Sequence, residues 1–193
     1  MDRIALTQFI QSTIPLSAEK AETISLQFHP KNFAAGHMLV KSGKVNDTYF
    51  FLETGFMRSF LFDTEGNEVT VNFYPQNSVV FEVASLFQRA PSHENIEALT
   101  ESSGWALTYE ELNKLFHEVP EFREFGRAVL VKGFIAFKER TLSMINKTAE
   151  ERYDALIRTK PEIFQNAPLK YIASYLGVTD TSLSRIRREY IKK

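Results

Sequence analysis

The most informative stretch of this 193-residue sequence is PLKYIASYLGVTDTSLSRIRREY, at residues 168–190. Pro168 suits the first turn of a helix, because its missing N–H would have no partner there. Gly177 can adopt the left-handed conformation that ends this helix, and Thr179 can cap a second one. Two short helices joined by such a turn are typical of a helix–turn–helix. Its inner face is predicted to comprise Ile172, Ala173, Leu176, Leu183 and Ile186.

The second of these helices has a polar and basic outer face. Hydroxyl and guanidinium groups of this kind donate hydrogen bonds to the bases and phosphates of DNA. The charge distribution agrees, because residues 168–193 contain six Lys or Arg against two Asp or Glu, whereas residues 1–167 contain 17 against 22. A basic end on an acidic body favours a polyanionic partner, although a solvated terminal helix would carry the same charge. We therefore predict that double-stranded DNA is a partner and that it is bound by Thr179, Thr181, Ser182, Ser184, Arg185, Arg187 and Arg188.

The sequence pattern changes between residues 28 and 108, where short runs of aromatic and β-branched residues alternate with turn signals. Glycines at positions 36, 43, 55 and 66 mark these turns. Ten of the 17 phenylalanines fall between residues 28 and 87, which suits the interior of a small roll. Short strands at this spacing predict an antiparallel β-roll of the jelly-roll type. The preceding residues 1–27 are predicted to be helical, with Ser17 as a cap.

A long helix is predicted between the roll and the helix–turn–helix. Residues 121–146 contain no proline, and apolar residues recur in them at steps of mostly three and four. Such a helix would be about 39 Å long, and a broad apolar stripe of this length often packs against a symmetry mate. We therefore predict a homodimer, with coverage of the chain's own roll as the alternative. The predicted dimer interface comprises Phe122, Phe125, Val129, Phe134 and Phe137.

This order of a glycine-punctuated roll, a long helix and IASYLGVTDTSLSRIRR resembles the Crp/Fnr family of transcription regulators. The resemblance extends from about residue 10 to residue 190 and is most specific in the helix–turn–helix. It implies a homodimer joined through the long helix, a sensory roll like a cyclic-nucleotide-binding domain, and paired recognition helices that read a palindromic operator. It also makes RNA polymerase a candidate partner. Arg185 matches the arginine that contacts DNA in relatives, and Ser184 precedes it as in Fnr-type members.

The C-terminal part departs from the family pattern in two respects. Thr181 stands where the recognition helix usually has a glutamate, so the preferred half-site of the family is not carried over. The sequence also ends within a few residues of Tyr190, so the wing that follows this helix in most members is expected to be reduced or absent.

The ligand site departs further. Glu82 matches the glutamate that holds the ribose hydroxyl in cyclic-nucleotide binders, but Phe81 replaces the glycine before it. Ser92 falls near the arginine that pairs with the cyclic phosphate, and Glu94 and Glu97 flank that place. Carboxylates repel a phosphate, so we do not expect cyclic AMP to bind to this degenerate pocket of Glu82 and Ser92. The roll either holds another small molecule or is filled by phenylalanines, and no residue distinguishes the two.

Composition excludes several other classes of protein. Cysteine is absent, which rules out disulfides, thiolate metal sites and cysteine nucleophiles. The four histidines lack the spacing of a metal site, and the sequence contains no P-loop and no nucleophile elbow. No run of apolar residues is long enough to span a membrane, and the N-terminus does not resemble a signal peptide. We therefore expect a cytoplasmic protein that is not an enzyme and has no metal, cofactor or membrane partner.

The predicted architecture is α+β and has three parts. Residues 1–120 form the sensory roll, residues 121–147 the dimerisation helix, and residues 148–193 the helix–turn–helix domain. The predicted function is a dimeric DNA-binding transcription regulator that responds to an unknown effector at the roll. The alternative is a cupin-like β-barrel, enzymatic or ligand-binding, whose helical tail is only structural. Salt-dependent binding to duplex DNA would separate the two, because a barrel enzyme should show none.

Overall fold

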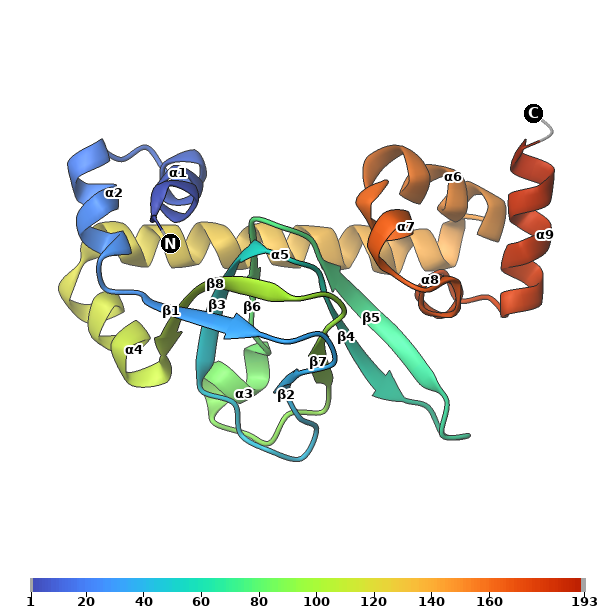
Figure 1. The fold of residues 1–193 in the computed structure, drawn as a ribbon, viewed down its shortest axis with the longest axis horizontal. Helices are drawn as coiled ribbons and strands as arrows, with labels where there is room; N and C mark the ends of the chain where they lie inside the picture. The colour runs from blue at the N-terminus through green and yellow to red at the C-terminus, as the bar shows by residue number, and fades with distance from the viewer. Residues whose placement is uncertain (1, 192–193) are drawn as a thin grey trace.

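The computed structural model describes residues 2–191 and arranges them along one long helix, α5 (Pro120–Asn146). Two N-terminal helices, α1 (Ile4–Thr13) and α2 (Ala18–Ser25), lie at one end of α5, and the C-terminal helices lie at the other, with the strands below its middle (Figure 1). The Ser17 hydroxyl accepts a hydrogen bond from the Lys20 N–H at the start of α2, as its predicted cap role requires.

The strands form two antiparallel four-stranded sheets. The first has the order β1-β8-β3-β6 and the second the order β2-β7-β4-β5. The short helix α3 (Val83–Gln88) connects β6 to β7, and α4 (Tyr109–Glu118) follows β8. The strands are β1 (His29–Phe33), β2 (Met38–Val40), β3 (Thr48–Thr54), β4 (Met57–Phe62), β5 (Glu68–Tyr74), β6 (Ser78–Val80), β7 (Asn95–Ala98) and β8 (Ser102–Thr108).

The predicted turns and the phenylalanine-filled interior are both present. The four glycines between residues 36 and 66 all have positive φ angles, from +78° to +102°. Gly55 also has no room for a side chain, because a Cβ there would overlap the backbone of Glu101 and Ser102. The two inner faces share one core, in which Phe50 and Leu52 of the first sheet pack with Met57 and Ile96 of the second. The α+β class with an antiparallel roll is thereby confirmed.

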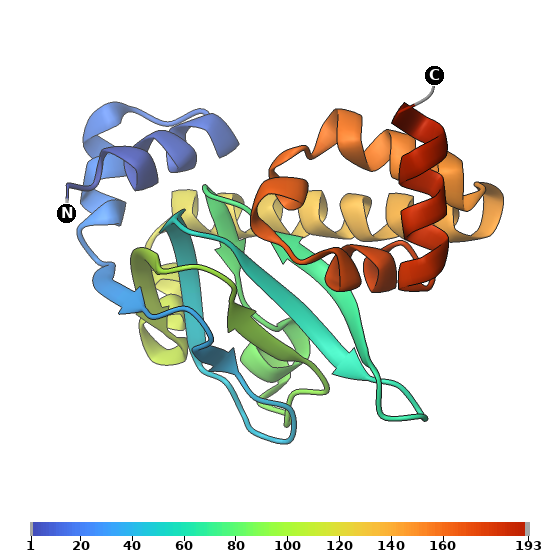
Figure 2. The same ribbon diagram turned by 45° about the vertical axis from the view of Figure 1, so that its right-hand side comes forward.

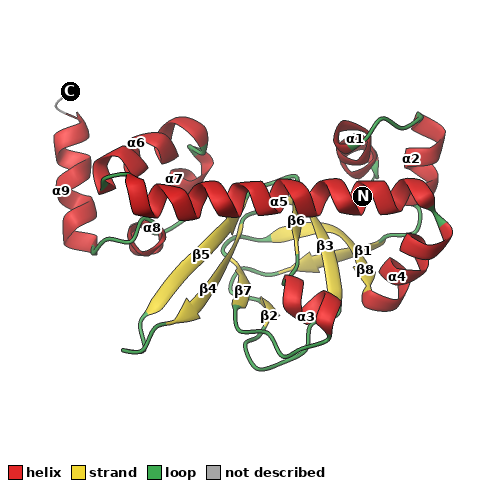
Figure 3. Ribbon diagram, turned by 180° about the vertical axis from the view of Figure 1, so that it is seen from behind, coloured by secondary structure: helices red, strands yellow, loops and turns green. Residues whose placement is uncertain are grey.

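The long helix α5 runs across the whole molecule (Figure 3). Its first turns belong to the chain's own core, because Phe122 and Phe125 are fully buried among residues of α1, β3 and α4, and Val129 packs against the same cluster. The prediction that Phe122 and Phe125 lie in a dimer interface is therefore wrong, because a side chain buried within its own chain has no surface to offer a partner. Val129 is only half-buried, so its place in the interface stays a prediction. Phe134 and Phe137, in contrast, are 66% and 61% exposed. No helix among residues 2–191, α5 included, has the length and apolarity needed to cross a membrane.

Four helices follow α5 and group at its end, namely α6 (Ala149–Thr159), α7 (Glu162–Asn166), α8 (Leu169–Tyr175) and α9 (Asp180–Ile191). Figure 2 shows this group next to the strands β4 and β5. Phe56 and Phe73 of the roll share a buried cluster with Tyr175 and Leu183 of the helices. Because the two parts share this core, the domain boundaries at residues 120 and 147 stay a prediction.

Candidate functional site

The helix–turn–helix forms from local interactions that the sequence encodes. Pro168 is the N-cap of α8, and Gly177 has a φ of +67° in the turn that ends this helix. The Gly177 N–H donates to the Ser174 carbonyl, and the Val178 N–H donates to the Ala173 carbonyl, both at 3.0 Å. These bonds satisfy carbonyl groups that the end of α8 would otherwise leave without partners. The five predicted inner residues are all buried.

Thr179 and Ser182 are occupied at the start of α9. The Thr179 hydroxyl accepts a hydrogen bond from the Ser182 N–H at 3.2 Å and donates one to the Ser182 hydroxyl oxygen at 3.0 Å. This is the geometry of an N-cap, which the sequence predicts for Thr179. The two residues thus help to form the helix that would contact DNA, and their direct contact with DNA stays a prediction.

The outer face of α9 is free and basic. Thr181, Ser184, Arg185 and Arg188 are exposed, and Arg187 is half-buried. None of the three arginines forms an ion pair within residues 2–191. Leu183 and Ile186 are buried on the opposite side, so packing fixes which face α9 presents to solvent. Such a face can enter a major groove and donate to bases and phosphates.

Two arginines that the sequence analysis missed hold the end of α8. Arg152 of α6 donates from Nε and Nη2 to the Leu176 carbonyl at 3.1 and 2.8 Å. Arg140 of α5 donates from Nη2 to the Tyr175 carbonyl at 3.0 Å. Cations at the C-terminus of a helix also favour its dipole. Nothing in the local sequence indicates these contacts, since donor and acceptor lie more than 20 residues apart.

The two residues predicted at the effector pocket both have structural partners. The Glu82 carboxylate caps α3, where it accepts from the N–H groups of Ala84 and Ser85 at 3.1 and 2.6 Å. Ser92 is buried, and its hydroxyl donates to the Glu94 carbonyl at 2.7 Å. Their place in an effector pocket stays a prediction. The nearby Arg89 is also engaged, with its guanidinium 4.5 Å from the centroid of the Tyr109 ring.

The inner face of the second sheet has acidic surroundings close to Glu82 and Ser92. Register places Ser59 and Asn72 side by side on β4 and β5, and the buried Ser59 hydroxyl lies close to the side chains of Glu94 and Tyr74. Burial raises the pKa of Glu94, and repulsion by Glu82 raises it further. Burial, followed by the charge of Glu94, also raises the pKa of Tyr74 to about 12. An interior of this kind opposes the binding of a phosphate.

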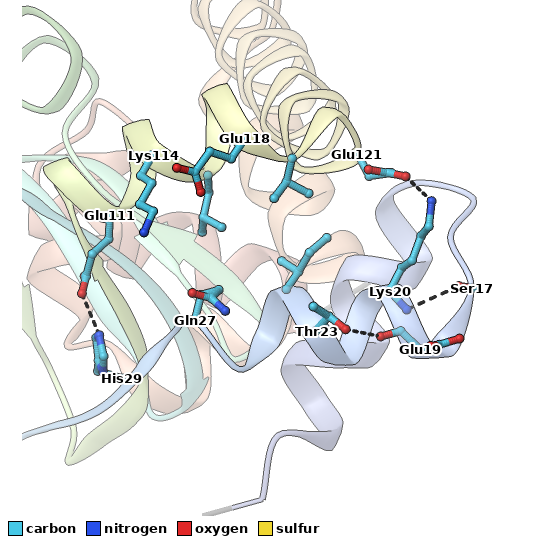
Figure 4. Close-up of a pocket in the computed structure, with 13 residues that line it drawn as sticks. Ser17, Glu19, Lys20, Thr23, Gln27, His29, Glu111, Lys114, Glu118 and Glu121 are labelled. Carbon is cyan, nitrogen blue, oxygen red and sulfur yellow. Dashed lines mark hydrogen bonds and ion pairs between the residues drawn. The ribbon is translucent and has the colours of Figure 1, made fainter.

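A groove lies elsewhere, between α2 and α4 (Figure 4). It has a volume of about 690 Å³ and none of the predicted site residues lines it. Two ion pairs tie its walls together, one between Lys20 and Glu121 and the other between His29 Nε2 and Glu111 Oε1 at 2.7 Å. The Thr108 N–H, followed by His29, lowers the pKa of Glu111. These pairs join α2 to α5 and β1 to α4, which stabilises the end of the molecule remote from α9.

Comparison with known proteins places this geometry in a wider group. Residues 30–119 match the family model of the cyclic nucleotide-binding domain. Electron transport regulator A of Shewanella oneidensis is 24% identical in an alignment 175 residues long, which covers 84% of this chain and 68% of that protein.

Solved structures share the fold over almost the whole chain. The c-di-GMP-responsive global regulator CLP of Xanthomonas campestris superposes with a TM-score of 0.71 at 14% identity, covering 91% of this chain and 92% of CLP. A Eubacterium rectale chain named as a transcriptional regulator of the Crp/Fnr family superposes with a TM-score of 0.69 at 14% identity, covering 93% and 87%. Residues 30–119 are therefore similar to a cyclic nucleotide-binding domain, and the chain has the fold seen in a solved regulator of the Crp/Fnr family.

Proposed function

We propose that this protein is a transcription regulator that binds double-stranded DNA through the outer face of α9. The observation that carries the proposal is the coincidence of an ordered helix–turn–helix with an exposed, unpaired basic face. Arg185 and Arg188 lie on that face, while Leu183 and Ile186 anchor the helix from behind. A helix presented in this way is the element that helix–turn–helix proteins place in the major groove.

The protein is further proposed to act as a homodimer joined through the second half of α5. Supporting this, the part of α5 beyond the roll core exposes large apolar side chains, a surface that water does not favour. Two copies paired along this face would present two copies of α9, which is the arrangement that reads a palindromic operator with half-sites about 34 Å apart. The exposed residues are Leu130, Val131, Phe134, Ile135, Phe137, Leu142, Met144 and Ile145.

The effector at the roll is proposed to be something other than cyclic AMP. Supporting this, Ser92 is buried and engaged, Arg89 is stacked on Tyr109, and Glu94 sits partly buried near Glu82. None of these groups is available to neutralise a cyclic phosphate, and two of them repel it. The cupin-like alternative is not favoured, because solved structures of transcription regulators share the fold over almost the whole chain, the helical tail included.

Selection of genomic fragments by the purified protein tests the proposal. The wild-type protein should enrich a set of fragments that share an inverted repeat, and its affinity for them should fall steeply with salt concentration. A variant with Arg185→Ala and Arg188→Ala should enrich none. Arg127→Ala is the matched control, because Arg127 is an exposed arginine of α5 paired with Glu124 and far from α9 along the helix. Failure of the wild type to enrich any fragment would contradict the proposal.

A further inference from the structure

Arg58 is the largest fully buried side chain of the described structure, with 1% of its surface exposed. It lies on β4 between Met57 and Ser59, which belong to the interior face of the roll. Because successive side chains of a strand point to opposite faces, Arg58 points outward, toward the C-terminal helices. A guanidinium that is removed from water needs anions, hydrogen-bond acceptors and a tight cover.

The roll supplies the polar partners of Arg58. Its Nε donates to Glu97 Oε1 at 2.5 Å, its Nη2 to Glu68 Oε2 at 2.5 Å, and its Nη1 to Thr70 Oγ1 at 3.3 Å. Glu97 lies on β7 between Ile96 and Ala98, which are buried in the interior core. The strand β7, whose Glu97 neutralises Arg58, therefore also lines the interior of the roll.

The cover comes from both parts of the chain. The centroid of the Phe60 ring, on β4 itself, lies 4.2 Å from the guanidinium carbon of Arg58, and the helix–turn–helix supplies the closer ring. The guanidinium carbon of Arg58 lies 3.3 Å from the centroid of the Tyr171 ring on α8, a cation–π contact across the boundary between the two parts of the chain. A second contact lies beside it, where the Thr70 N–H of β5 donates to the Ser174 hydroxyl oxygen of α8 at 3.1 Å. The helix α8 packs on β5 as a whole (Figure 2).

We propose that Arg58, Thr70, Tyr171 and Ser174 form a latch between the roll and the helix–turn–helix, and that this latch sets the direction in which α9 faces DNA. The proposal rests on the proposed function. Only Leu176–Thr179 separate α8 from α9, and both helices contribute to one buried cluster, so fixing α8 also fixes α9. The closed latch leaves Arg185 and Arg188 exposed, so it positions the DNA-binding face instead of covering it.

Hydrogen exchange measured on the full-length protein without DNA tests the latch. In Tyr171→Leu, the amide of Thr70 and the amides of α8 should exchange about tenfold faster than in the wild type, because the contact of Arg58 with the helix–turn–helix is lost while its anions and the Phe60 ring remain. Tyr171→Phe retains the aromatic face and should exchange like the wild type. Tyr109→Leu is the matched control: it removes the Arg89–Tyr109 contact, which lies inside the roll, and should leave the exchange of Thr70 unchanged.

Affinity for a duplex that the wild type selects from a random pool tests the positioning role. Tyr171→Leu should bind this duplex about tenfold more weakly, because a mobile recognition helix must be ordered on binding, whereas Tyr171→Phe and Tyr109→Leu should bind it normally. Unchanged exchange at Thr70 in Tyr171→Leu would overturn the latch. Faster exchange with equal or tighter binding would overturn its positioning role. The exchange data do not depend on DNA, so a wild type that selects no duplex would contradict the proposed function separately.

Discussion

Gly177, in the turn of the helix–turn–helix, packs against Met144 near the end of α5. The methyl carbon of Met144 lies 2.5 Å from the position that a Cβ on residue 177 would occupy. The φ of +67° favours glycine at this turn, and a side chain at residue 177 would also require the methyl group of Met144 to move. This contact adds a third attachment of the helix–turn–helix to the rest of the chain, beside those at β5 and at Arg140.

We expect Gly177→Ala to lower the free energy of unfolding by more than the roughly 1–2 kcal/mol that a left-handed conformation costs a residue with a Cβ. Gly66→Ala is the control for the backbone cost alone, since Gly66 has a φ of +84° and open space around its Cβ position. Urea denaturation at a fixed protein concentration measures both. The excess at Gly177 should disappear in a Met144→Ala background, and an equal cost at the two glycines would show that Met144 moves aside freely.

Phe134→Glu or Phe137→Glu should convert the dimer to a monomer, because each would place a charge in an apolar interface. Analytical ultracentrifugation measures the mass. Phe62→Glu is the matched control, since Phe62 is 57% exposed but lies on β4 at the far end of the roll hairpin. If both α5 variants remain dimeric, the interface lies on another surface.

Arg185→Ala should weaken binding to the selected operator and leave binding to random duplex nearly unchanged. An arginine on this exposed face can donate twice to one guanine, which is worth about 1–3 kcal/mol of discrimination. Arg188→Ala should weaken both and reduce the salt slope by about one unit, as expected for a phosphate contact. Fluorescence anisotropy over a range of salt concentrations measures these effects. An equal loss on both duplexes in Arg185→Ala would identify Arg185 as a backbone contact.

Cyclic AMP should neither bind tightly nor raise the affinity for DNA, because the interior near Glu94 is acidic and the nearby Arg89 is stacked on Tyr109. Isothermal titration calorimetry with the purified protein is the measurement. A micromolar or tighter dissociation constant would be the contrary result. Loss of that binding in Arg89→Ala would then identify Arg89 as the phosphate ligand, released from its stack on Tyr109.

Glu94→Gln should stabilise the protein at pH 7. Burial raises the pKa of Glu94 in the folded protein above its unfolded value, so the folded state binds the proton more tightly than the unfolded state does. The charged carboxylate therefore lowers the free energy of unfolding at neutral pH, and this penalty disappears as the pH falls below the ordinary glutamate pKa. Urea denaturation should accordingly show the gain at pH 7 and little gain at pH 4.

The matched substitution Glu97→Gln should instead lower the free energy of unfolding at pH 7. Glu97 lies on the same segment but faces outward and neutralises the buried Arg58, so its removal leaves a buried cation with one anion fewer. A stabilising Glu97→Gln or a destabilising Glu94→Gln at pH 7 would contradict this account of the two carboxylates.

Local signals in the sequence predict the helices and turns. They do not predict which other part of the molecule covers each surface. Thr179, Gly177 and the capping box of Thr148 and Glu151 act within a few residues of the chain, so the sequence predicts them directly. Phe122 and Phe134 have the same residue type and lie in one run of apolar residues, yet one is buried and the other exposed. Twelve residues separate them, which places them about 120° apart around the axis of α5. Periodicity defines an apolar face and does not say which neighbour covers it.

Within the candidate site, too, sequence predicts features of one short segment but not contacts between distant segments. The outer face of α9 is predictable because its polar residues alternate with Leu183 and Ile186 in one short segment. The contact between Arg58 and Tyr171 joins a strand of the roll to a helix near the C-terminus. A lone arginine in an aromatic strand gives no indication of which distant ring it will meet, so only the tertiary structure reveals the contact.

Because α5 is one uninterrupted helix, a small tilt at its roll end produces a displacement at its other end. Phe122 is fixed in the roll core, and Met144 touches the turn of the helix–turn–helix about 33 Å farther along the same rod. A tilt of about 5° at the roll end would displace the Met144 end by about 3 Å, given the rise of 1.5 Å per residue. That displacement is close to the spacing of roughly 3.4 Å between adjacent base pairs. A change in the roll too small to alter its fold would therefore shift α9 by about the spacing of one base pair.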